Sequence, residues 1–567
     1  MERRQLFIAG IALLVMSVFL ALPVTGQLKQ EPVDTAAMGM IREEGLQRSK
    51  VMETASYLTD VFGPRLTNSP NIKAAAQWTM KKMTEWGMTG VNLEAWGPFG
   101  RGWSNERTYV AMTKPYAFPL IAYPRAWTPG TNGTVKGDAV LAIINTPEDM
   151  EDCRGKLRGK FVMPAATPAV PAQFNAPGSR FTDQQLETMA NPPQRGRGGQ
   201  GGNQGGGRGN AAAPAPAKLP GQFCGGVLPA PQAARGQGGQ QQQQQQQQQN
   251  FANQRNRFYL DEGVLALVSH GQAAGGVAGG TVFVQSAGGR NATDPPVPPY
   301  ISLAAEHYGM LMRNVEKNVP VSLEMNIENK FYDDDLNAFN VIGEIRGTDK
   351  ADEVVMVGAH FDSWHTGTGA TDNAAGSAIM MEVMRILKAT GLPMRRTVRI
   401  ALWTGEEQGL FGSAAYVRDH FAVRETMALK PEHGKMSVYF NVDNGTGQIR
   451  GVYTQANEGS RPVLQAWMEP LKDFGMTTLS PAGTGGTDHT NFDAVGLPGF
   501  QFIQDDIEYD TRTHHSNMDV YERLQSKDMM QNAVIVASFV YNAATRDELF
   551  PRKPLPAPPA QRGGRGQ

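Results

Sequence analysis

DEVVMVGAHFDSWHTGTGATDNAAGSAIMMEVMRILKATGLPMRRTVRIALWTGEEQG, residues 352–409, is the stretch of sequence that decides the fold. Two short runs in it, 354–358 and 398–403, are rich in apolar and β-branched residues, which predicts two buried strands. Apolar residues recur between them at helical spacing from Ile379 to Leu387. Because parallel strands need a crossover connection, this strand–helix–strand order indicates a parallel sheet. We therefore predict an α/β fold with a mixed, mostly parallel central sheet flanked by helices.

Polar side chains follow each of these two predicted strands. His360 and Asp362 come after the first, and Glu406 and Glu407 come after the second. Sites in open α/β sheets form at the carboxyl ends of the strands. Acidic and imidazole groups at that edge predict a chemically reactive site, most simply one that binds a metal.

The bulk composition excludes several classes of protein. The chain has 567 residues and a net charge of −1, which gives no support for nucleic-acid or membrane-surface binding as its main function. Cys153 and Cys224 are the only cysteines, so neither a disulfide framework nor a cysteine-rich zinc site can form. One disulfide between them and two unpaired thiols are both compatible with the sequence.

The first residues read MERRQLFIAGIALLVMSVFLALPVTGQ, with two arginines, an apolar run and a small-residue ending. This order predicts a secretory signal peptide over residues 1–26, and hence an exported protein that is periplasmic or extracellular. The alternative is an uncleaved anchor, which would be the chain's only membrane contact.

Shifts in composition divide the rest of the chain. We expect residues 28–115 to begin the main domain and residues 335–545 to complete it. Residues 116–330, with short β-rich runs, are expected to form a second, smaller domain. Its Gly-, Pro- and Gln-rich segment 167–257 and the tail 546–567 are both predicted to be disordered, because they lack apolar surface to offset the entropy of ordering.

Five candidate metal ligands each follow a break in the chain: His360, Asp372, Glu407, Asp443 and His515. Two imidazoles and three carboxylates suit zinc or a similar divalent ion. With one carboxylate bridging, this set gives three protein ligands to each of two metals, which would share an activated water. Each residue alone has an ordinary explanation as a polar surface group, so the prediction rests on the set.

Two further acids have roles in this interpretation. Glu406, beside Glu407, is predicted to be the general base that takes a proton from the water. Asp362, two residues after His360, is predicted to hold the imidazole from behind.

Six motifs resemble those of the M28 family of dizinc peptidases, in the family's order and with similar spacing. They are GAHFDS (358–363), GATDNAAG (369–376), WTGEEQGLFGS (403–413), NVD (441–443), GTDHTNF (486–492) and THHSNMD (513–519). The resemblance covers residues from about Asn337 to Ala543, and GPRLTNSPN upstream also looks like the start of this fold. It implies a zinc-exopeptidase fold with two Zn²⁺ per chain.

The resemblance also implies roles for single residues. His360 and Asp443 would bind one zinc, Glu407 and His515 the other, and Asp372 would bridge them. His515 is preferred to His514 because the family's ligand is followed by Ser or Thr and by Asp four residues later. The smaller domain looks like a protease-associated (PA) insertion, similar to the carboxypeptidase Q-like and PA-bearing aminopeptidase branches, in which a homodimer is possible.

Several other side chains stay open at this point. Asp488 and His489 lie in a family loop near the substrate and are candidate binding or supporting residues. His365 could compete for metal, although a surface position is the ordinary expectation. Asp505 and Asp506 are among the acids that could meet a substrate's α-amino group.

The sequence therefore predicts an exported zinc exopeptidase, an aminopeptidase or dipeptidase, that acts on peptides or dipeptides. One alternative is a metal-dependent hydrolase or acyltransferase of non-peptide amides. The other is a catalytically inactive binding protein of the same fold, since fold alone does not fix function.

Overall fold

The computed structural model describes residues 31–193, 218–227, 238–271 and 279–559. The predicted signal peptide, residues 1–26, lies outside this part of the chain. None of the helices described there combines the length and the apolar character needed to cross a bilayer.

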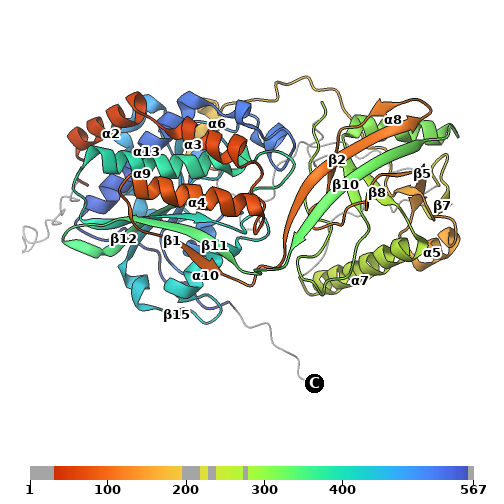
Figure 1. Ribbon diagram of the computed structural model, residues 1–567. Helices are drawn as coiled ribbons and strands as arrows, with labels where there is room; N and C mark the ends of the chain where they lie inside the picture. The colour runs from red at the N-terminus through yellow and green to blue at the C-terminus, as the bar shows by residue number, and fades with distance from the viewer. Residues whose placement is uncertain (1–30, 194–217, 228–237, 272–278, 560–567) are drawn as a thin grey trace, which may run out of the picture.

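The described chain forms two units, of which the larger is built on an eight-stranded sheet (Figure 1). Its central strands run parallel and its first and second strands antiparallel, which confirms the predicted mixed α/β sheet. In sheet order the strands are β1 (Thr89–Trp96), β11 (Ala338–Ile345), β13 (Arg396–Trp403), β12 (Lys350–His360), β16 (Met436–Asn441), β19 (Gly499–Gln504), β17 (Ile449–Tyr453) and β18 (Thr478–Ser480).

Helices cover both faces of this sheet. The predicted helix is α9 (Ala375–Thr390), which is buried on almost every side and ends at Gly391, where a left-handed φ of 63° stops it. The helices on its face are α2 (Thr35–Gln47), α3 (Val51–Ser56), α4 (Pro70–Glu85), α11 (Arg461–Met468) and α13 (Ser526–Thr545). The opposite face carries α10 (Phe411–His420), α12 (His489–Asp493) and the hairpin of β14 (Ala422–Val423) and β15 (Ala428–Leu429).

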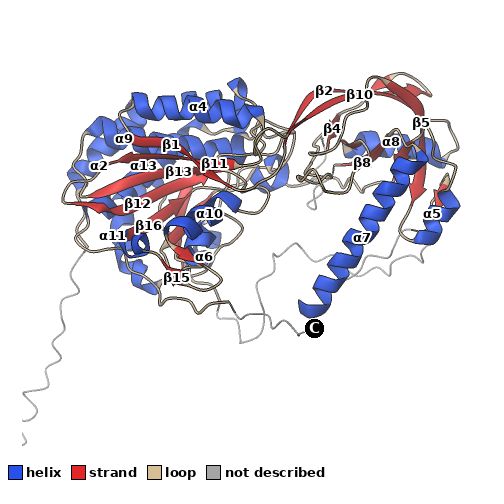
Figure 2. Ribbon diagram, turned by 60° about the horizontal axis from the view of Figure 1, so that its bottom comes forward, coloured by secondary structure: helices blue, strands red, loops and turns tan. Residues whose placement is uncertain are grey.

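The second unit has a mixed sheet of its own with helices on both faces. Helix α8 (Ala305–Glu316) packs on one face, and α5 (Pro147–Cys153) and α7 (Gly238–Glu262) pack on the other (Figure 2). In sheet order the strands are β3 (Phe118–Pro119), β2 (Gly102–Lys114), β10 (Ser322–Tyr332), β5 (Val135–Ile143), β6 (Phe161–Met163), β8 (Ala266–His270), β9 (Tyr300–Leu303) and β4 (Ala122–Pro124), with β7 (Cys224–Gly225) beside β5.

The predicted boundary at residue 115 is wrong. Strand β2 pairs with β10 along its whole length, from Gly102 opposite Tyr332 to Lys114 opposite Ser322. The second unit therefore begins just before Gly102. A local sequence pattern does not show which of two sheets a strand joins.

The expectation of disorder over residues 167–257 is also wrong for much of the segment that the structure describes. Helix α6 (Asp183–Ala190) begins with a capping box formed by Thr182 and Gln185. The glutamine run continues into α7, whose last turns bury Phe258 and Tyr259 against the second sheet. Glutamine is a good helix former, so a buried aromatic end is enough to extend the helix into the run.

The tail is ordered further than expected, at least through Lys553. Phe550 is buried between the rings of Trp467 and Phe500. Lys553 forms an ion pair with Asp493 and donates a hydrogen bond to the carbonyl of Gln455. One buried aromatic side chain therefore holds the start of a Pro-rich tail against the main unit.

Cys153 and Cys224 form a disulfide in the second unit, which resolves the alternative left open by the sequence. Cys153 ends α5 and Cys224 lies in β7, and both side chains are buried beside Phe258 and Tyr259. The bond closes a loop with a sequence separation of 71 that contains the Gly-rich insert. It therefore joins the end of α5 to β7 within the core of the second unit.

We expect the double variant Cys153→Ser, Cys224→Ser to lower the free energy of unfolding by about 2–4 kcal/mol, because the unfolded chain regains the entropy of an open loop. Urea denaturation measures this change. A reductant should shift the wild-type midpoint toward that of the variant and leave the variant unmoved. Equal midpoints for the oxidised wild type and the double variant would contradict a stabilising role.

Candidate metal centre

The candidate residues meet at the carboxyl edge of the parallel strands in the main unit. Strand β12 ends at His360, the turn after β13 carries Glu406 and Glu407, and Asp443 follows β16. The remaining two come from the segment before α9 and from a late loop. A cavity of about 630 Å³ has all six sequence-predicted side chains in its wall: His360, Asp372, Glu406, Glu407, Asp443 and His515.

His360 is fixed in a single useful tautomer. Its Nδ1 lies 2.9 Å from the carbonyl oxygen of Asp362, which can only accept a hydrogen bond. Nδ1 therefore carries the proton, and Nε2 is left to face Asp372 Oδ1 at 3.1 Å and Asp443 Oδ1 at 3.0 Å. A metal-ligating imidazole is commonly oriented in this way, by a backbone carbonyl on its other nitrogen.

Asp372 lies between two imidazoles. Its Oδ1 faces His360, and its Oδ2 lies 3.2 Å from His515 Nε2. This Oδ2 is buried and has no hydrogen-bond partner among the described residues. Each oxygen of one carboxylate is therefore directed at a different imidazole, as a bridging ligand requires.

Glu407 completes the second side of the cluster. Its Oε2 lies 2.8 Å from His515 Nε2, and its Oε1 is buried without a hydrogen-bond partner in the described chain. The two sides thus have matching compositions. One has His360, Asp443 and an oxygen of Asp372, and the other has His515, Glu407 and the second oxygen of Asp372.

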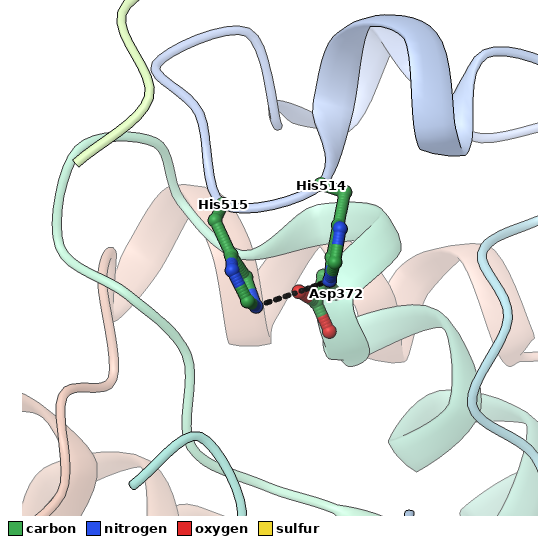
Figure 3. Close-up of side chains that lie close together, drawn as sticks. All are labelled: Asp372, His514 and His515. Atoms are coloured by element: carbon green, nitrogen blue, oxygen red, sulfur yellow. Dashed lines mark ion pairs between the residues drawn. The ribbon is translucent and has the colours of Figure 1, made fainter. Parts of the chain in front are cut away.

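The structure distinguishes His515 from its neighbour His514. Each of the two histidines directs one ring nitrogen at Asp372, as Figure 3 shows. The ligand atoms of all three side chains lie within 4.8 Å of one another. However, His514 Nε2 is 3.9 Å from Asp372 Oδ2, and the His514 side chain is 42% exposed. His515 is closer to Asp372 and also contacts Glu407, which favours it as the ligand.

The charges in the cluster fit divalent cations. Burial alone would lower the pKa of His515, but the attraction of Glu407 and Asp372 outweighs it and raises this pKa to about 10. The carboxylates around His360 raise its pKa in the same way. Positive charge is therefore favoured at both Nε2 positions. Protons on the imidazoles supply this charge without a metal. Divalent cations would supply it better, because they would also coordinate Asp372 Oδ2 and Glu407 Oε1, which have no hydrogen-bond partner among the described residues.

Glu406 belongs to the wall of the same cavity. Burial, together with the charges of Asp443 and Asp488, raises its pKa well above the usual range of a carboxyl group. A carboxylate with a raised pKa accepts a proton readily from a neighbouring donor. The assignment of Glu406 as the general base stays a prediction.

Asp362 supports the site differently from the prediction. Its carboxylate is 3.7 Å from His360 Nδ1, and the backbone carbonyl makes the close contact instead. The carboxylate accepts N–H groups from Glu406 and Glu407 at 3.3 Å and a hydroxyl from Thr67 at 2.9 Å. Asp362 therefore shapes the turn that presents the base and one ligand.

Arg65 is a supporting residue that the sequence did not single out. It is fully buried, and its guanidinium donates to the carbonyl oxygens of Phe361, Thr368 and Gly369. These bonds join the end of β12 to the loop that leads into Asp372. The only sequence indication was its place in GPRLTNSPN, since nothing in a local pattern predicts partners about 300 residues away.

Asp519 holds the backbone at Asp372 in place. It accepts hydrogen bonds from the backbone N–H groups of Thr371 at 2.6 Å and Asp372 at 3.1 Å, and from the Thr371 hydroxyl at 2.8 Å. Burial and the nearby charge of Asp372 raise the pKa of Asp519 to about 7.

Four other candidates are held by contacts within the protein. Asp488 and His489 are buried; Asp488 accepts a hydrogen bond from the Ser413 hydroxyl, and His489 contacts Gln455. Their role as binding or supporting residues stays a prediction. His365 is half-buried, and its Nε2 lies 2.7 Å from the carbonyl oxygen of Pro124 in the second unit. Asp505 is buried and paired with Arg180 and Arg450, which removes it as a partner for an α-amino group.

Comparison with known proteins agrees with this geometry. Residues 340–540 match the sequence model of Peptidase family M28. Carboxypeptidase Q of Mus musculus is 30% identical over 257 residues, which cover 45% of this chain and 52% of that protein. Aminopeptidase YwaD of Bacillus subtilis (strain 168) is 30% identical over 205 residues, covering 35% and 43%. The chain thus spans about half the length of the curated relatives that it matches.

A solved structure extends the likeness in fold beyond the matched segment. The peptidase M28 precursor of Shewanella amazonensis SB2B superposes with a TM-score of 0.60 at 20% identity, over 92% of this chain and 98% of that one. The fold is therefore shared across both units.

We expect the metal-free protein to lose stability between about pH 5 and pH 9. Folding raises the pKa values of Glu407 and Asp519 to about 7 and that of His515 to about 10. Groups with raised pKa values stabilise the fold while they are protonated, and this contribution is lost as the pH rises through those values. The pKa of Asp372 is shifted the opposite way, and its window lies below this range.

Thermal unfolding with and without zinc tests this expectation. Added Zn²⁺ should raise Tm more at about pH 8 than at about pH 5.5, because the ligands must release protons to bind it. A metal-free Tm that is flat over this range, or an equal zinc shift at both pH values, would contradict the account.

Proposed function

Because residues 340–540 belong to peptidase family M28, we propose that this protein is a zinc exopeptidase that hydrolyses peptide bonds at the ends of peptides or in dipeptides. The observation that carries the proposal is the placement of Asp372 between His360 and His515, with a second carboxylate beside each imidazole. This arrangement suits two zinc ions that share one carboxylate.

The residues divide into three tasks. His360, Asp443 and Asp372 would hold one zinc, and His515, Glu407 and Asp372 the other. Bound zinc supplies Lewis acidity and lowers the pKa of water at this site. Glu406 takes a proton from the attacking water on its carboxylate and returns it to the leaving amine when the peptide bond breaks. Asp362 and Asp519 hold the turn and the bridging carboxylate that these tasks require.

The proposal includes export and a PA-like role for the second unit. A disulfide between Cys153 and Cys224 is typical of proteins that mature in an oxidising compartment, which supports export to the periplasm or the extracellular space. The second unit interrupts the main unit before β11, where the sequence resemblance puts a PA insertion. The homodimer remains part of the same proposal.

We expect Glu406→Gln to lower kcat by about 100- to 10,000-fold, because the amide cannot accept the proton from water. Zinc content should stay at the wild-type level, since Glu406 is not one of the proposed ligands. Glu458→Gln is the matched control, because Glu458 pairs with Arg461 on the surface, away from the cavity. Near-normal turnover in Glu406→Gln would show that the base is assigned wrongly.

A substrate panel tests the activity itself. Aminoacyl anilides, free dipeptides and N-acyl amino acids separate an aminopeptidase, a dipeptidase and an amide hydrolase. The proposal expects zinc-dependent cleavage of anilides or dipeptides that a chelator abolishes. Cleavage of N-acyl amino acids alone, or zinc binding without any cleavage, would replace the peptidase by one of the two alternatives.

A further inference from the structure

A ribbon of the second unit, residues 280–286, lies against the loop that carries His515. Val284 donates its N–H to the carbonyl of His515 at 3.2 Å, and Phe283 forms an antiparallel bridge with Ser516. The ring of Phe283 lies 5.7 Å from that of His515. Beside it, the side-chain amide nitrogen (Nε2) of Gln285 lies 3.2 Å from His515 Nδ1, so that in this orientation the amide donates to the ring. The second unit therefore touches both the backbone and the imidazole of this proposed ligand.

Asn517 fixes the register of the ribbon. Its side-chain oxygen accepts the N–H of Val282 at 2.6 Å, and its side-chain nitrogen donates to the carbonyl of Gly280 at 3.1 Å. Its own N–H donates to the carbonyl of Val282 at 3.2 Å. With three bonds at one residue, the ribbon cannot slide along the loop without losing them.

The ribbon alternates as a strand does. Val282 and Val284 are buried in the second unit, at 0% and 1% exposure, while Phe283 and Gln285 are directed at the loop of the main unit. The N–H of Ala126 donates to the carbonyl of Gln285 and holds this end of the ribbon to the second unit. Gln285 is thus presented by a fixed backbone.

His515 needs such support. Its φ is 57°, in the left-handed region that residues with a Cβ seldom adopt. Residues in this region persist when their surroundings determine them, and here part of those surroundings is the ribbon. The backbone contact from Val284 and the side-chain contact from Gln285 act on the same residue.

We propose that Gln285 is a positioning residue from the second unit, which orients His515 by accepting the proton on its Nδ1. When Nε2 binds a metal, Nδ1 must carry the proton and needs an acceptor. A half-turn of the Gln285 amide presents its oxygen to that proton. His360 has its acceptor, the carbonyl of Asp362, within the main unit. Of the two histidines, only His515 takes the acceptor for its Nδ1 proton from the second unit.

This inference rests on the proposed zinc peptidase function, and the test uses zinc binding so that the two can fail separately. The probe is Zn²⁺ alone, titrated into the metal-free full chain in competition with a chelator. Gln285→Leu removes the acceptor and keeps the size of the side chain, and Gln285→Met is a second variant of the same kind. Gln285→Glu keeps an acceptor, and Ser286→Ala is the control on the same ribbon.

We expect two zinc sites in the wild type and in Ser286→Ala. Gln285→Leu and Gln285→Met should weaken one site by about 10- to 100-fold and leave the other unchanged. Gln285→Glu should restore the weakened site, because a carboxylate also accepts the Nδ1 proton. Unchanged thermal unfolding of the metal-free variants shows that the loss is not one of folding.

Other outcomes overturn the proposal. Wild-type affinity at both sites in Gln285→Leu, equal weakening of both sites, or a Gln285→Glu variant as weak as Gln285→Leu would each exclude the positioning role and leave the peptidase intact. A wild type that binds no zinc would instead remove the proposed function, and this inference with it.

Discussion

The centre of this protein depends on one carboxylate that has an imidazole on each side of it. Asp372 directs Oδ1 at His360 and Oδ2 at His515, and each imidazole has a further carboxylate beside it. Such a group of buried acids is costly unless positive charge balances it. The raised pKa values of both histidines express the same requirement. Under the proposed function, two divalent cations would meet this requirement.

The surrounding structure can be understood as the support for that carboxylate. Asp519 accepts the N–H groups of Thr371 and Asp372, and Arg65 ties the preceding loop to the end of β12. Helix α9 begins at Ala375, three residues after Asp372, and is buried between the sheet and the other helices on that face. The second unit adds a contact to His515 from the opposite side. Residues from distant parts of the chain therefore fix one side chain, and the short sequence motifs around it carry the ligands.

The sequence predicts those features of the fold and the candidate site that depend on local patterns. Periodicity predicted β12, α9 and β13. Polar residues after breaks in the chain, together with the family motifs, predicted six of the side chains that line the cavity. Arg65 and Gln285 could not be found in this way, because their partners are far away in sequence and nothing in a local pattern marks them. The same limit explains why β2 was placed in the wrong unit.

Composition misled in two places for a related reason. The Gln-rich segment and the Pro-rich tail were expected to be disordered, but Phe258, Tyr259 and Phe550 are buried against the rest of the protein. A few apolar side chains are enough to order a polar segment when a cavity in the fold accepts them. The average composition of a segment does not predict such contacts. For the same reason it did not predict that Asp488 and His489 are buried.

X-ray diffraction at the zinc absorption edge, from crystals of the zinc-loaded protein, tests the central claim most directly. The account predicts two anomalous peaks about 3.5–4 Å apart. One should lie beside His360 and Asp443, the other beside His515 and Glu407, and both beside Asp372. A single peak, or a second peak held by His514 in place of His515, would contradict it.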